Sequence, residues 1–174
     1  RYIFTLLNGY EIIEFSKMRY LMIIALVVLS LACNVYSGDW TRWGGSDNSG
    51  NMFSPELNTP SSFEPGKLKP GTDEIDITTT KNVKWIAKLG SQSYGNAVVG
   101  KGKVLVGTNN EFPRDKRHIG DRSILLCLNE ETGEFLWQLV ITKHPAGKAI
   151  DWDNLGLVCS PTIDDNCVYI VSTR

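Results

Sequence analysis

The sequence has little of the net charge and motif content that marks many familiar chemistries. Its 18 Lys and Arg nearly balance 19 Asp and Glu, for a formal net charge of −1 over 174 residues. Nucleic-acid binding normally needs a basic patch or stripe, so this balance argues against a nucleic acid as partner. The chain has no Gly-x-Ser-x-Gly elbow, phosphate-binding loop, dinucleotide fingerprint or His-Glu-x-x-His motif. No catalytic residue is therefore assigned.

Candidate metal ligands are also few. The only two histidines, His118 and His144, lie in expected loops without the spacing of metal ligands. Asp151, Asp153 and Asn154 offer oxygen atoms of the kind that Ca²⁺ prefers, but the rest of a calcium-binding loop is missing. No metal site is assigned.

Cysteine is limited to four residues, one of which, Cys33, lies near the N-terminus. Cys127 and Cys167 fall within predicted strands, where the simplest interpretation is a small buried hydrophobic side chain. Cys159 and Cys167 are not expected to be cross-strand partners. A disulfide among Cys127, Cys159 and Cys167 stays open, since exported proteins can form them.

The chain contains one long apolar run, at residues 21–32. Its 12 residues are too few for a typical membrane span and suit the hydrophobic region of a signal peptide. Met18 and Arg19 precede the run, and Val35 and Ser37 follow it as a small-residue cleavage site. The sequence therefore predicts a signal peptide at 18–37 and export to the periplasm or cell envelope.

Three alternatives remain for this region. Cys33 follows an imperfect lipobox at 30–32, which would make the protein a lipoprotein. Residues 1–17 are either upstream sequence translated from a misplaced start or a real extension. In the second case the apolar run would persist as a membrane anchor. A buried core helix is the remaining reading of the run, and the β-rich sequence that follows disfavours it.

Two apolar segments around a tight turn dominate the rest of the chain. Residues 124–128 form a short run suited to a buried strand, and residues 135–142 are rich in aromatic and β-branched side chains. Between them, Gly133 can adopt a left-handed backbone, while Asn129 and Thr132 can bind nearby backbone groups. The pattern predicts a β-hairpin.

The sequence also repeats a hairpin. Residues 96–110 align without a gap with residues 160–174, at an offset of 64. Repeated hairpins with regularly spaced turns are typical of propeller blades or arrays. We expect four strands, at about 93–99, 103–108, 124–128 and 135–142, and the start of a second such unit at about 156–174.

The hairpin residues resemble the pyrroloquinoline-quinone-type (PQQ-like) β-propeller repeat, whose pattern is close to A-x-D-x-x-T-G-x-x-x-W. The matching positions are Cys127, Asn129, Thr132, Gly133 and Trp137, with Cys and Asn replacing the usual Ala and Asp. The irregular lead-in at 38–81 resembles the start of exported members of this family.

The resemblance implies an all-β fold, a β-propeller of four-stranded antiparallel blades. Residues 82–174 would supply about one and a half blades: blade one at 93–142 and the start of blade two at 156–174. In this family the Trp docks on the neighbouring blade, which makes Trp137 the expected buried anchor. Trp85 resembles the Trp that ends a blade, so residues 82–89 are expected to form an outer strand that pairs with the last blade of the ring.

The family includes both non-enzymatic scaffolds, such as the lipoprotein that helps to assemble outer-membrane β-barrels, and quinone-dependent dehydrogenases that bind PQQ and Ca²⁺. Fold alone does not choose between them. The adjacent cysteine pair of many such alcohol dehydrogenases is missing here, and no cofactor-binding residue can be placed. The resemblance therefore favours a binding or scaffold module, with a PQQ-dependent alcohol or sugar dehydrogenase as the alternative.

Strand parity locates a candidate binding face. In four antiparallel strands, the connections at 109–122 and 143–155 emerge on the same side, and both are long. Loops on a rigid scaffold commonly carry binding residues. The candidates for contact with a protein partner or a polar small molecule are Arg114, Arg117, His118, Asp121, Arg122, Asp151, Trp152 and Asp153. The competing interpretation is an ordinary solvated surface of mixed charge.

Overall fold

The computed structural model describes residues 38–45, 50, 52–54, 56, 59–144 and 152–172. Residues 1–17 and the predicted signal peptide at 18–37 lie outside this part of the chain. Within the described residues, no helix is long and apolar enough to cross a membrane.

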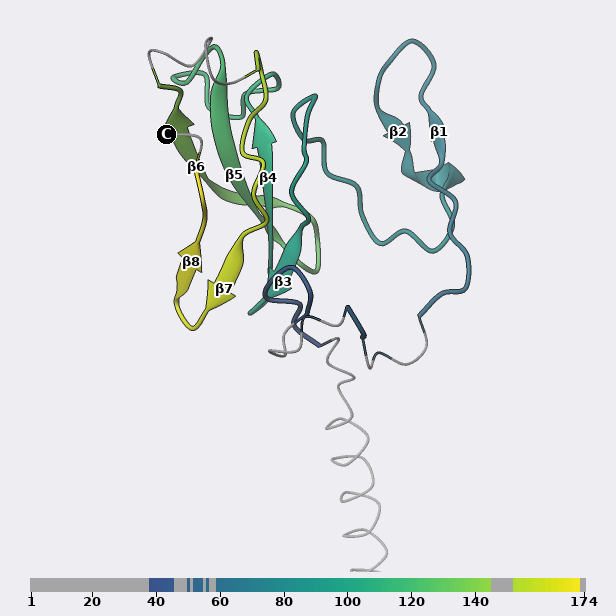
Figure 1. Ribbon diagram of the computed structural model, residues 1–174. Helices are drawn as coiled ribbons and strands as arrows, with labels where there is room; N and C mark the ends of the chain where they lie inside the picture. Colours follow the sequence, from purple (N-terminus) through teal and green to yellow (C-terminus); the bar gives the residue numbers. More distant parts are fainter. Residues whose placement is uncertain are drawn as a thin grey trace, which may run out of the picture. The chain divides into compact units, whose positions relative to one another are not determined.

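The centre of the fold is a four-stranded antiparallel sheet in the order β3-β4-β5-β6 (Figure 1). Its strands are β3 (Val98–Gly100), β4 (Lys103–Asn109), β5 (Arg122–Asn129) and β6 (Phe135–Thr142). Each strand pairs with the next one in the chain, so the predicted all-β architecture of antiparallel strands is confirmed. The first strand is shorter than expected, because the chain from Ser93 to Ala97 is not paired as a strand.

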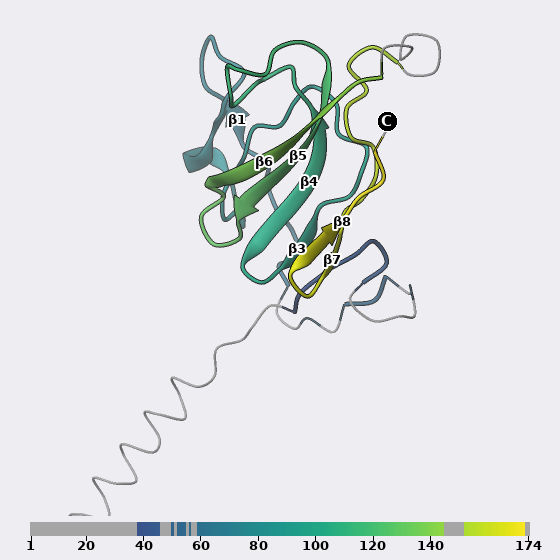
Figure 2. The same cartoon turned by 90° about the vertical axis from the view of Figure 1, so that its left-hand side faces the viewer.

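Two smaller hairpins accompany this sheet. One pairs β1 (Lys67–Leu68) with β2 (Ile75–Asp76), and it is followed by the short 3₁₀ helix η1 (Ile77–Thr79). The other pairs β7 (Thr162–Asp164) with β8 (Cys167–Tyr169). Figure 2 shows β7 and β8 next to β3.

The β7–β8 hairpin repeats the geometry of the β3–β4 hairpin. Gly100 pairs with Lys103 across the β3–β4 turn, and Asp164 pairs with Cys167 across the β7–β8 turn. The first residue after each of these strands has a left-handed backbone, with φ of 52° at Lys101 and 48° at Asp165. The hairpin repeat predicted from the sequence is thus present.

The turn between β5 and β6 is held by the residues that the sequence singled out. The backbone N–H of Gly133, at φ 72°, donates to the Asn129 carbonyl. The Asn129 side-chain oxygen accepts from the N–H groups of Glu131 and Thr132, at 2.8 and 2.9 Å. These bonds satisfy backbone donors that would otherwise lack a partner in a tight turn.

Both faces of the sheet are covered, which explains the continuous apolar sequence of β4 and β5. One face contains a cluster of Val98, Leu105, Leu125, Cys127 and Leu157, against which Ile163 and Ile170 of the second hairpin region pack. The opposite face contains Val106, Ile124 and Leu126, with Leu89 and Val140 packed against them. The middle strands are therefore buried on both sides.

The lead-in connects the β3–β4 hairpin to the β7–β8 hairpin through two backbone hydrogen bonds. The N–H of Val99 in β3 donates to the Trp40 carbonyl at 2.9 Å, and the N–H of Ile163 in β7 donates to the Thr41 carbonyl at 2.7 Å. Two large apolar side chains of the lead-in are nevertheless exposed to solvent. Trp43 and Phe53 are 65% and 71% exposed.

The prediction of a strand at 82–89 is wrong for the described structure, which assigns no strand to these residues; the isolated bridge between Glu64 and Lys81 lies just before them. Asn82 has a left-handed backbone, with φ 55°. The burial of residues 83–89 nevertheless alternates from one residue to the next, as in a strand. A strand assignment requires a hydrogen-bonded neighbour, and the described residues do not provide one.

Candidate functional site

The two long connections lie together at one end of the sheet. Asn154 joins them: its N–H donates to Asp121 at 2.9 Å, and its side-chain amide donates to Glu111 at 2.9 Å. Its carbonyl accepts from the Asn109 side chain at 2.7 Å. We call this surface the loop face and define it as residues 110–121, 143–144 and 152–155.

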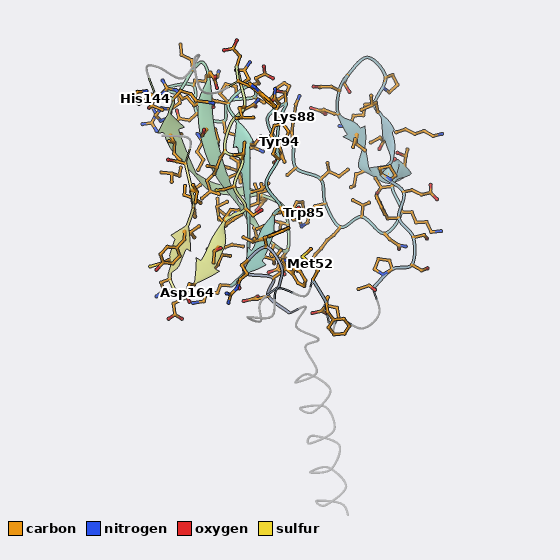
Figure 3. All side chains as sticks on the ribbon, viewed as in Figure 1. Met52, Trp85, Lys88, Tyr94, His144 and Asp164 are labelled. Atoms are coloured by element: carbon orange, nitrogen blue, oxygen red, sulfur yellow. The ribbon has the colours of Figure 1, made fainter. Side chains whose placement is uncertain are left out.

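The predicted parity of the connections is confirmed. The tight turns at 101–102, 130–134 and 165–166 follow the opposite ends of the strands. Figure 3 shows His144 on the side of the loop face and Asp164, in the second hairpin, at the other end. The long connections therefore share one face because antiparallel strands alternate in direction.

Arg114 is used within the fold and is not presented to a ligand. Its guanidinium donates to the Lys88 carbonyl and lies 5.6 Å from the centre of the Phe135 ring. Burial lowers the pKa of Arg114, and the cation keeps its charge because guanidinium groups lose their proton only at very high pH. Lys88 is also engaged, with its ammonium 3.8 Å from the Phe112 ring centre and paired with Asp73.

Asp115, Arg117 and His118 form a local cluster. Arg117 binds Asp115 through two side-chain nitrogens, at 3.0 and 2.7 Å, and through its backbone N–H. These hydrogen bonds hold the pKa of Asp115 well below its usual range. His118 is 3.9 Å from the same carboxylate. The Arg117 side chain is 85% exposed, so solvent screens this ion pair and it stabilises the fold little.

Asp121 and Arg122 hold the connections in place. Asp121 accepts from the Asn154 N–H and lies 4.0 Å from the Lys143 ammonium. Arg122 donates to the Ile119 carbonyl at 3.0 Å and to the Thr142 hydroxyl at 3.1 Å. Both side chains thereby help to fix the two connections to each other and to the sheet.

The outward-facing candidates are fewer than the sequence suggested. Trp152 is 73% exposed, Asp153 is exposed, and Asp151 lies outside the described residues. Sequence reasoning missed Ile119, which is 71% exposed, and Phe112, which is 45% exposed. The signal available in the sequence was an apolar side chain within a loop of otherwise mostly charged and polar residues.

The residues that the structure describes include no group of three or more His, Cys, Asp or Glu side chains able to hold a metal ion. Asn154, one of the candidate oxygen donors, is held by Glu111, Asp121 and Asn109. No residue of the described part can be assigned to PQQ.

The cysteines of the described part are free thiols. Cys127 in β5 is buried in the core cluster on one face of the sheet, and burial raises the pKa of its thiol. Cys159 accepts from the Val171 N–H, and Cys167 is exposed. These positions agree with the interpretation of Cys127 as a small core residue, whereas Cys167 is not buried as expected.

The docked tryptophan is Trp85 and not Trp137. The Trp85 indole N–H donates to the Glu130 carbonyl at 2.8 Å, and its ring lies against Gly133. Lys84 pairs with Glu131 in the same turn. Trp137 is 39% exposed and lines a cavity of about 250 Å³ together with Cys167 and Val168. The described residues therefore do not bury Trp137 fully, and its role as an anchor on the neighbouring blade stays a prediction.

Comparison of the chain with protein-family models, with curated proteins and with solved structures finds no match. The candidate site rests on the residues and contacts described above.

Proposed function

We propose that this chain is part of an exported, non-enzymatic β-propeller of the PQQ-like repeat type, which acts as a binding or scaffold module. The repeated hairpin supports the propeller, because its turns have the same backbone geometry at an offset of 64 residues. The burial of both faces of the four-stranded sheet also supports it, since stacked blades cover each other in this way. Docking of Trp85 on the β5–β6 turn is the contact that the repeat family makes between blades.

The observation that carries the binding role is the construction of the loop face. Asn154 ties the two connections together, and a turn in which the Leu155 N–H donates to the Trp152 carbonyl holds Trp152 outward. Trp and Arg are frequent anchors in protein interfaces, and a pre-ordered loop loses little entropy on binding. Arg117, Ile119 and Trp152 are thus the proposed contact residues for a protein partner.

The alternative, a PQQ- and Ca²⁺-dependent alcohol or sugar dehydrogenase, gains no support from the arrangement of the described side chains. The protein's binding role is separable from that activity by experiment.

Replacing Arg117, Ile119 and Trp152 together by Ala is expected to abolish capture of the partner in the full-length protein, with its melting temperature nearly unchanged. The reason is that these three side chains are exposed or paired only locally. The measurement is quantitative mass spectrometry of proteins retained from a periplasmic extract of the native host.

The matched control replaces Phe63, Leu68 and Lys67 by Ala, which removes exposed side chains away from the loop face. Retention of every partner by the loop-face variant, or equal loss in both variants, would contradict the proposal. Reduction of a redox dye by the intact protein with PQQ, Ca²⁺ and an alcohol or sugar would favour the dehydrogenase instead.

Export is part of the proposal, and it gives a second prediction. Cleavage after Ser37 should produce a mature chain that begins at Gly38, because a charged start, an apolar run and a small-residue site follow one another at 18–37. Mass spectrometry of the protein from the native host measures the N-terminus. A mature chain that begins before Met18 would exclude a cleaved signal, and a diacylglyceryl group on Cys33 would identify a lipoprotein.

A further inference from the structure

The segment at 38–41, which we call the clasp, is attached to both hairpins of the repeat. The carbonyl groups of its last two residues accept hydrogen bonds from the N–H groups of Val99 in β3 and Ile163 in β7, at 2.9 and 2.7 Å. The Asp39 carboxylate accepts from the N–H of Lys101, in the β3–β4 turn, at 3.2 Å. A segment near a chain terminus is ordered when contacts of this kind tie it down. The clasp is therefore part of the folded domain.

The backbone nitrogen of Gly38, the first residue of the clasp, has a side-chain partner. It donates to a carboxylate oxygen of Glu56, 18 residues further along the chain. A Cβ atom at Gly38 would lie 2.9 Å from the same oxygen, so the lack of a side chain lets the carboxylate approach the backbone. The N–H of Glu56 donates to the Ser54 hydroxyl at 3.3 Å. A partly buried carboxylate is thus placed at the first backbone nitrogen of the clasp.

Cleavage after Ser37 would change the chemistry of this nitrogen. Hydrolysis of the peptide bond between Ser37 and Gly38 by a signal peptidase consumes one water molecule and leaves a carboxylate on Ser37 and an amino group on Gly38. An α-amino group is mostly protonated at neutral pH. The neutral N–H donor of the precursor thereby becomes a positively charged ammonium group. Hydrogen bonds between charged partners are roughly twice as strong as those between neutral partners.

We propose that Glu56 is the binding site for the α-ammonium group of the mature chain, so that cleavage creates an ion pair that strengthens the attachment of the clasp to β3 and β7. The inference rests on the proposed cleavage after Ser37 and adds a function for the new N-terminus. Ion pairs between accessible groups stabilise a fold little, so the effect is local to the clasp. The clasp reaches the β3–β4 turn, which lies at the end of the sheet opposite to the loop face, and partner binding there is independent of it.

The test is a double-mutant cycle on the full-length protein, produced behind a removable fusion that leaves Gly38 as the first residue. One change is acetylation of the α-amino group, which removes its charge and restores the neutral amide of the precursor. The other is Glu56→Gln. Hydrogen exchange of the Val99 and Ile163 amides measures how often the clasp detaches, because both amides donate to it. Either change should accelerate their exchange about threefold, and both together no more than one alone.

Two controls separate the ion pair from a general loss of charge or stability. Glu64→Gln removes another exposed carboxylate of the lead-in and should leave the Val99 and Ile163 amides unchanged. The Leu157 amide, which donates to the Thr108 carbonyl at 3.1 Å, should exchange at the same rate in every form.

Two results would overturn the inference from opposite sides. Unchanged exchange of the Val99 and Ile163 amides, or effects of acetylation and Glu56→Gln that multiply, would show that the two groups do not interact. A native mature chain that begins at any residue other than Gly38, including a lipidated Cys33, would remove the ammonium group that the site requires. Capture of a partner by the loop face should be equal in the free and acetylated forms, so the proposed binding function stands or fails on its own measurement.

Discussion

Replacement of Gly133 by Val is expected to destabilise the protein by roughly 3 kcal/mol or more. Gly133 has φ 72°, a region that β-branched residues resist. A Cβ atom at this position would lie 2.5 Å from Cδ2 and 2.6 Å from Cε3 of the Trp85 ring. Backbone strain and the displacement of Trp85 therefore act together. The free energy of unfolding, measured with denaturant on the full-length protein, tests this expectation.

Gly102 provides a matched control for the Gly133 experiment. It has nearly the same backbone, with φ 73°, but no atom lies within 4 Å of the Cβ that a substitution would add. Gly102→Val therefore measures the cost of the left-handed backbone alone. If the two variants lose the same stability, close packing of Trp85 on Gly133 is wrong.

Replacement of Trp85 by Ala is expected to cost about 3–5 kcal/mol, the usual range for removing a packed tryptophan. The loss includes ring contacts with Gly133 and the hydrogen bond from the indole to the Glu130 carbonyl. Residues 83–89 are also expected to lose their main attachment to the β5–β6 turn. Thermal and chemical unfolding of the full-length protein provide the measurement.

Trp137 is the control for this second experiment. It occupies the equivalent position in the repeat pattern but is 39% exposed, and no hydrogen bond from its indole to another described residue is present. Trp137→Ala should therefore destabilise the described part of the fold less than Trp85→Ala. Trp85→Phe should recover much of the packing and lose about 1 kcal/mol with the hydrogen bond. Equal losses at positions 85 and 137 would contradict the assigned roles.

The sequence predicted only in part which residues of the loop face are buried in the fold and which remain exposed. The pattern of long and short connections correctly placed both long loops on one side, because strand direction alternates along the chain. It did not distinguish Arg114, which reaches Lys88, from Arg117, which remains 85% exposed. Two arginines in one loop have the same chemistry, and only the position of neighbouring segments determines which one is buried.

Local signals were sufficient for the central strands and their turns. Continuous apolar runs predict β4 and β5 because both faces of these strands are buried, and the Asn129-to-Gly133 pattern predicts a turn whose bonds are made within a few residues. The hairpin repeat was visible for the same reason, since its register depends on nearby residues. These features are properties of short stretches of chain.

The tertiary structure alone decided the features that depend on distant segments. Trp137 is the tryptophan of the Thr-Gly-x-x-x-Trp pattern, but Trp85 is the one that lies against Gly133 in the described fold. Residues 83–89 have the alternation of a strand and no described neighbour to pair with. The anchoring role of Asn154 likewise requires Glu111 and Asp121 from another connection. The sequence by itself determined the strands, turns and repeat, because those follow from local backbone preference and burial period. Contacts between segments far apart in the chain decide the docking of Trp85, the lack of a paired neighbour at 83–89 and the joining of the two long connections. Local preference does not specify such contacts.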